Sequence, residues 1–183
     1  MVKKPEFTYE DLRNSILKKA RTIHSLSVEH GYTIEGNGEM YSFNDNDSGG
    51  VNFPMKKLKS AIIALHNHPH DFKEPSSFSG RDVYNLLYYK PHEIIVSSYG
   101  VCFCMKNGGT TRLPSDVMHA LDNKYNEIDT RLFNMYVRNQ NNASSRDMKA
   151  NYKRYAVELE REYRAFLTVY AGENNLLYTE EKL

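Results

Sequence analysis

The sequence lacks the features that would set it apart from an ordinary globular protein. It has no tryptophan, only two cysteines among 183 residues, and no apolar run long enough to cross a bilayer. Its N-terminal residues, with Lys3, Lys4 and Glu6, lead into an amphipathic pattern and lack the apolar core of a signal peptide. We therefore expect a cytoplasmic protein with no membrane partner.

An excess of charge of one sign is also missing. The formal net charge is +1, so nucleic acid and anionic membrane surfaces are not indicated as partners. Hydrophobic residues make up 40% of the chain and charged residues 26%, as is common in globular proteins. The length is sufficient for one domain with a sizeable core and an appendage.

The two cysteines, Cys102 and Cys104, stand one residue apart in an apolar segment with strand-like composition. Two neighbouring residues on one face of a strand have poor geometry for a disulfide bond. We expect both to be buried free thiols, and a metal-binding role is the weaker alternative.

Apolar periodicity and turn residues predict an α/β fold, in which a mixed, mostly antiparallel sheet is flanked by helices. The predicted elements are helix 8–25, strands 28–34 and 40–43, helix 54–60, strand 62–68, helix 79–90, strands 93–98 and 100–105, and helices 115–138 and 146–171. We divide the chain into a core, 1–112, and a C-terminal two-helix extension, 113–183. Each helix of the extension has an apolar stripe, which would pack on the core, on the other helix, on a second copy or on a partner protein.

The most informative stretch is residues 62–69, an apolar run that ends in two histidines. His66 and His68 lie two residues apart, so a strand would present both imidazoles on the same face. Pro69 would end the strand, because it has no N–H group to donate.

A helix start follows this strand. Ser79 is predicted as the N-cap and Asp82 as the third helical residue, which places the carboxylate on the first turn. Together with His66 and His68, Asp82 would complete a set of three zinc ligands. Three protein ligands leave a coordination position for water, as in catalytic zinc sites.

These residues resemble a known signature. His66-x-His68-Pro69 followed by Ser79-x-x-Asp82 is similar to the motif of the JAMM (MPN+) metalloproteases, which include deubiquitinating isopeptidases. RadC-type and phage-associated relatives share the His-Asn-His-Pro form. The resemblance spans residues 29–105 and implies a JAMM-like fold, a zinc ion, and a protein or peptide substrate.

The resemblance also implies the remaining roles. Glu29 stands at the start of the expected strand 28–34 and would be the acid/base residue, with Glu35 as the second candidate. Ser79 would help to stabilise the oxyanion in addition to capping its helix. The segment between His68 and Ser79 is about three residues longer than is usual in the family, a difference that costs little closure entropy. His70, within it, is interpreted as a surface residue.

Other interpretations of these patterns are weaker. The letters His-Asn-His also name a nuclease motif, but that motif spreads its residues over two strands and a helix. The acidic segment 44–50 could suggest calcium, but it lacks the distal glutamate of an EF-hand. The main alternative is a non-catalytic binding or assembly module of a phage, mobile-element or DNA-associated complex, acting through the C-terminal helices.

Overall fold

The computed structural model describes residues 7–44, 50–69, 74–138 and 144–183. In this part of the chain, six strands form one mixed sheet in the order β2-β1-β3-β4-β5-β6. The strands are β1 (Gly31–Glu35), β2 (Met40–Phe43), β3 (Ala61–Asn67), β4 (Glu93–Ser98), β5 (Val101–Asn107) and β6 (Leu176–Lys182). Only β3 and β4 pair in parallel, and the other neighbours are antiparallel. The predicted α/β fold is confirmed.

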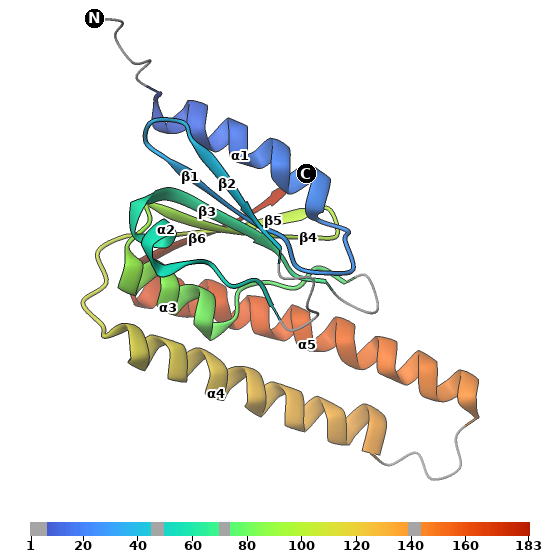
Figure 1. The fold of residues 1–183 in the computed structure, drawn as a ribbon. Helices are drawn as coiled ribbons and strands as arrows, with labels where there is room; N and C mark the ends of the chain where they lie inside the picture. The colour runs from blue at the N-terminus through green and yellow to red at the C-terminus, as the bar shows by residue number, and fades with distance from the viewer. Residues whose placement is uncertain (1–6, 45–49, 70–73, 139–143) are drawn as a thin grey trace, which may run out of the picture.

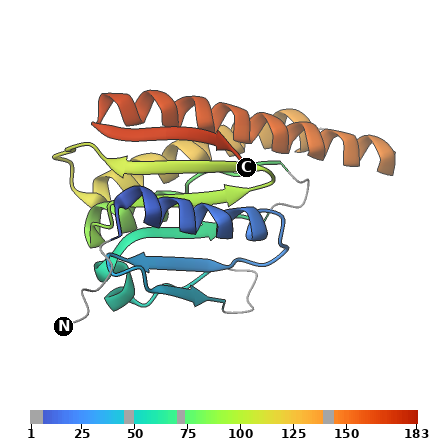
Figure 2. The ribbon, with the colours of Figure 1, turned by 90° about the horizontal axis from the view of Figure 1, so that it is seen from above.

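Helices cover both faces of the sheet (Figure 1). They are α1 (Tyr9–Ile23), α2 (Met55–Ser60), α3 (Gly80–Tyr89), α4 (Pro114–Phe133) and α5 (Ser145–Glu173), with a π-helical segment (Asn134–Arg138) after α4. Helix α1 lies on one face, and α3, α4 and α5 lie on the other. Figure 2 shows α5 running alongside β6 and extending past the ends of the strands.

The alternation of side chains along β3 divides the core in two. Ile63 and Leu65 pack in the cluster under α1, whereas Ala64 packs in the larger cluster under α3, α4 and α5. His66 is two residues beyond Ala64, and it therefore lies on the face that α3 covers. The apolar pattern of β3 thus directs the first histidine towards α3.

Both cysteines are buried free thiols, as predicted. They belong to the cluster under α1. Burial raises the pKa of Cys102 to about 12, so this thiol stays protonated at neutral pH.

The C-terminal region contains a strand that the sequence analysis missed. After α5 the chain turns at Asn175, which has a φ of 53°, and β6 then pairs with β5 along its whole length. Leu176 is buried and Leu177 is exposed, but the rest of the segment is mostly polar or charged, so its period-two signal is weak. Pairing with β5 decides its conformation.

Some predictions concern residues outside the described part of the chain. Most of the acidic segment 44–50 is among them, because residues 45–49 are not described. His70 is also outside it. Within the described residues, none of the helices combines the length and apolarity required to span a membrane.

The division at residue 112 stays a prediction, and core packing provides a test of it. Leu121 of α4 is fully buried in the cluster that also contains residues of β4 and β5. We expect Leu121→Ala to lower the free energy of unfolding of the whole chain by about 2–5 kcal/mol. Val169→Ala, at a site that is 59% exposed on α5, is the control and should cost less than about 0.5 kcal/mol.

Chemical denaturation followed by circular dichroism and by tyrosine fluorescence measures this cost. The two probes should report one transition, shifted equally by Leu121→Ala. Two transitions, with only one of them sensitive to Leu121→Ala, would show that the extension unfolds separately.

Candidate metal centre

The end of β3 and the start of α3 bring the three predicted ligands together. His66 is in β3, His68 follows it directly, and Asp82 is on the first turn of α3. His66 is 5% exposed and Asp82 is 7% exposed. Within the described residues, these three form the one cluster of histidine, cysteine or acidic side chains able to hold a metal ion.

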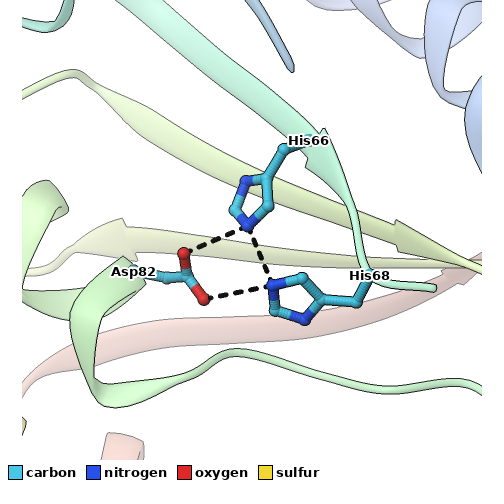
Figure 3. Close-up of side chains that lie close together, drawn as sticks. All are labelled: His66, His68 and Asp82. Atoms are coloured by element: carbon cyan, nitrogen blue, oxygen red, sulfur yellow. Dashed lines mark hydrogen bonds and ion pairs between the residues drawn. The ribbon is translucent and has the colours of Figure 1, made fainter. Parts of the chain in front are cut away.

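The ligand atoms of the three side chains face one another (Figure 3). The Nε2 atoms of His66 and His68 are 2.9 Å apart. Asp82 Oδ1 is 3.1 Å from His66 Nε2, and Asp82 Oδ2 is 3.5 Å from His68 Nε2. The three groups therefore enclose one small space.

The dimensions of this space fit a zinc ion. Two ligands at about 2.0–2.1 Å from zinc, at a tetrahedral angle, lie roughly 3.3–3.4 Å from each other. The three observed separations, 2.9, 3.1 and 3.5 Å, bracket this value. Two imidazole nitrogens and a carboxylate oxygen are also a ligand set that zinc prefers.

The surroundings of His68 prepare it as a ligand. Its Nδ1 is 2.7 Å from the carbonyl oxygen of Ser77, which can only accept a hydrogen bond. Nδ1 therefore carries the proton, and Nε2 presents its lone pair to the site. The backbone is held as well, because the Ser98 hydroxyl donates to the His68 carbonyl oxygen at 2.8 Å. His66 Nδ1, by contrast, is buried without a partner among the described residues.

A capping box fixes Asp82. The Ser79 hydroxyl donates to Asp82 Oδ2 at 2.6 Å and the Ser79 backbone N–H donates to the same oxygen at 2.8 Å. In return, Ser79 Oγ accepts from the Asp82 backbone N–H at 3.3 Å. Oδ2 thus accepts both bonds of the cap, whereas Oδ1 accepts neither and faces His66 Nε2. The predicted N-cap is confirmed.

The charges of the site are strongly coupled. Burial acts to raise the pKa of Asp82, but the two histidines and the Ser79 hydroxyl outweigh it and hold that pKa far below its usual range. Burial acts to lower the pKa of His66, but the Asp82 carboxylate overcomes it and raises the pKa. The pKa of His68 is lowered by burial, with His66 as a further cause.

Glu29 lies at the same site, but not within a strand as the sequence analysis expected. Strand β1 begins only at Gly31. Asn67 of β3 holds the segment before it, and the Asn67 backbone N–H donates to the His30 carbonyl oxygen at 3.2 Å. Asn67 accepts from the His30 N–H at 2.6 Å and donates to the Val28 carbonyl oxygen at 3.1 Å. Glu29 is thereby held between two anchored residues.

Asn67 is the residue that sequence reasoning missed. It stands between the two histidines, so its fully buried side chain points to the opposite side of the strand and reaches the segment that carries Glu29. A fully buried amide makes hydrogen bonds wherever the fold offers partners. The only available signal was its position between His66 and His68.

Glu35 is at the wrong end of β1 for the role of second candidate. Gly31 pairs with His66, whereas Glu35 pairs with Ala61 at the far end of β3. Its carboxylate accepts from Lys57 at 3.1 Å and from Ser60 at 2.8 Å. These bonds make Glu35 part of a surface ion pair.

A cleft of about 590 Å³ opens over the three ligands. Glu29 and Ser79 line it together with His66, His68 and Asp82. Glu29 Oε2 accepts from the Val51 N–H at 2.8 Å, which orients the carboxylate on the cleft wall. The cleft is large enough to receive a segment of a peptide.

The chain was compared with family models, with curated proteins and with solved structures, and none of them matches it significantly.

Metal content tests the ligand set. We expect the purified protein to bind zinc with a stoichiometry near one, and His68→Ala or Asp82→Ala to reduce it below about a tenth, because two ligands rarely retain the ion. His119→Ala, which removes an exposed histidine of α4, should keep full zinc. Elemental analysis after dialysis measures the content, and equal zinc in all variants would contradict the assignment.

The affinity for zinc should depend on pH in one direction. The raised pKa of His66 in the metal-free protein means that zinc must displace a proton as the pH falls. Below that pKa, we expect the zinc affinity to drop about tenfold for each pH unit. Competition with a chromophoric chelator between pH 5 and 8, around the usual histidine pKa of about 6.5, measures it. An affinity independent of pH would exclude histidine ligands.

Proposed function

We propose that the protein is a zinc-dependent hydrolase that cleaves a peptide or isopeptide bond, as the resemblance to the JAMM metalloproteases implies. One observation carries the proposal: a three-ligand set and a separate carboxylate, Glu29, line the same cleft. Ligands alone would serve a structural metal equally well. A carboxylate next to them is what hydrolysis requires in addition.

The residues divide the chemistry between them. His66, His68 and Asp82 would hold the zinc ion, which supplies Lewis acidity and lowers the pKa of water. Glu29 would accept the proton that water loses on attack and pass it to the leaving amine. Its charge acts on both histidines, because it adds to the raised pKa of His66 and opposes the lowering of the pKa of His68. That coupling supports its place within reach of the reacting groups.

Ser79 would have two roles. Its hydroxyl orients Asp82 through the bond to Oδ2, and it also lines the cleft. In the second role the hydroxyl would turn its one proton from Asp82 to the oxyanion that forms at the scissile carbonyl, while the Ser79 backbone N–H would keep its bond to Asp82 Oδ2. Capping is a structural contribution of about 1 kcal/mol, so the two roles are separable by experiment.

A second candidate function is that of a binding module, in which α4 and α5 recruit a partner or a second copy. Large apolar side chains are exposed near the C-terminal end of α4 and the N-terminal end of α5, where the two helices extend past the sheet (Figure 1). They are Phe133, Met135, Met148 and Tyr152. In this candidate the metal would be structural, and no bond would be cleaved.

Substitution of Glu29 separates the two functions. We expect Glu29→Gln to retain zinc but to lower the rate of cleavage more than about 10³-fold, because the amide cannot accept a proton. Ser79→Ala should be milder, at about 10²–10³-fold. Glu35→Gln is the matched control and should leave the rate unchanged, since Glu35 is bound to Lys57 and Ser60 away from the cleft.

The rates are measured on libraries of peptides and isopeptide-linked peptides with zinc-loaded protein. If Glu29→Gln and Glu35→Gln are equally active, the role of Glu29 is wrong. If fully zinc-loaded protein cleaves nothing while a partner binds the helical extension, the module is the better account.

A further inference from the structure

A second, smaller cavity lies on the far side of His68, between the metal centre and the C-terminal helices. Its volume is about 180 Å³, and His68 and Ser79 line both this cavity and the large cleft. A cavity of about 150 Å³ is sufficient for a benzene-sized group. A side chain could therefore enter it from a substrate that is bound at the metal centre.

The walls of the cavity combine aromatic rings and carboxylates. Tyr125 and Asp122 come from α4, and Glu160 and Tyr163 come from α5. Gly80 allows α3 and α4 to approach each other closely beside the cavity, because a Cβ there would lie 2.7 Å from the Met118 carbonyl oxygen and would also collide with Asp122. The C-terminal helices thus contribute directly to a space beside the metal centre.

The carboxylate of Glu160 is buried without a counter-ion among the described residues. The residue is 3% exposed, and its carboxylate accepts only from the Ser76 hydroxyl at 3.0 Å and the Ser77 N–H at 3.4 Å. Arg164 is one turn away, but its guanidinium bonds to the Glu160 carbonyl oxygen and to Glu180. A buried carboxylate is costly unless a cation or strong donors compensate it.

Two further polar groups on the cavity wall have no partner within the described residues. Ser77 Oγ is fully buried and makes no hydrogen bond. The Asp122 carboxylate, which is partly exposed, has no ion pair there either. Nearly all buried polar groups in proteins make a hydrogen bond, so the Ser77 hydroxyl is available to a group bound in the cavity, and so is the carboxylate of Asp122.

The electrostatic character of the space is negative. The pKa of Tyr163 is raised first by burial and then by the charges of Asp122, Asp82 and Glu160. An anionic group would be repelled here.

A second metal ion is also disfavoured as the occupant of the cavity, because the described residues contain no other cluster of metal ligands. A cation on an apolar stem fits best, since the stem packs on the rings and the charge meets the carboxylates.

We propose that this cavity is a specificity pocket that takes an unmodified lysine side chain of the substrate, with its ammonium group at Asp122 and Glu160. Its use in catalysis rests on the proposed hydrolase function. The binding itself does not, because none of the pocket's acidic groups is a metal ligand. In this account the C-terminal helices recognise the substrate.

Binding of two small probes tests the pocket. Nα-acetyl-lysine amide and Nα-acetyl-norleucine amide, which has the same carbon chain without the ammonium group, are titrated into the full-length protein, with and without zinc, and followed by protein NMR. Nα-acetyl-arginine amide is titrated in the same way for comparison. We expect the lysine probe to bind at least about tenfold more tightly, since hydrogen bonds to charged groups are worth that factor or more. Equal affinity of the two probes would overturn the proposal, and so would a preference for the arginine analogue.

Matched variants locate the binding. Glu160→Gln and Asp122→Asn should each weaken the lysine probe about fivefold or more while leaving the norleucine probe unchanged. Glu173→Gln on α5 and Asp116→Asn on α4, both exposed, are the controls and should have no effect. If neither pocket variant alters the preference for lysine, the probe binds elsewhere and the proposal is wrong.

The two proposals fail differently. A protein that binds the lysine probe at this pocket but cleaves no bond would contradict the hydrolase function alone. A protein that cleaves peptides without any preference for lysine, in binding or in cleavage, would contradict the pocket alone. The comparison of probes uses the unaltered chain, so it remains decisive even if a pocket variant fails to fold.

Discussion

The contact between the end of β3 and the first turn of α3 determines the rest of the site. Two imidazoles and one carboxylate meet there, His66 and Asp82 buried and His68 mostly buried, an arrangement that is costly in free energy without a shared proton or cation. The fold meets part of this cost by fixing two of the three groups from outside. The Ser79 cap holds Asp82, and the Ser77 carbonyl oxygen holds His68. A cation placed among them would satisfy the lone pairs that face inward.

Strand β3 and the residue that follows it position both the metal ligands and the candidate base, Glu29. Because side chains alternate, His66 and His68 face α3 while Asn67 faces the opposite way and bonds the backbone around Glu29. One three-residue segment therefore positions the metal ligands and, through the backbone, the candidate base. The loop before α3 links this centre to α5, because Ser77 contacts both His68 and Glu160. The helical extension is thus structurally connected to the site.

Much of this was predictable from local sequence. The histidine spacing, the proline that ends the strand and the Ser79–Asp82 capping box are short-range signals, and each predicted the correct element. The features that the sequence did not predict depend on contacts between residues that are distant in the chain. Strand β6 is specified by its partner β5, and the segment before β1 is held by Asn67. The small cavity needs α3, α4 and α5 together, and no local pattern encodes that packing.

The central claim is that zinc binds to two histidines and an aspartate. X-ray absorption spectroscopy of the zinc-loaded protein tests it most directly, because the method reports the identity and distance of the ligands. The account predicts four light ligands, two of them imidazoles, at about 2.0–2.1 Å. Scattering from sulfur at about 2.3 Å, which only Cys102, Cys104 or a methionine could supply, or a spectrum without imidazole, would contradict it.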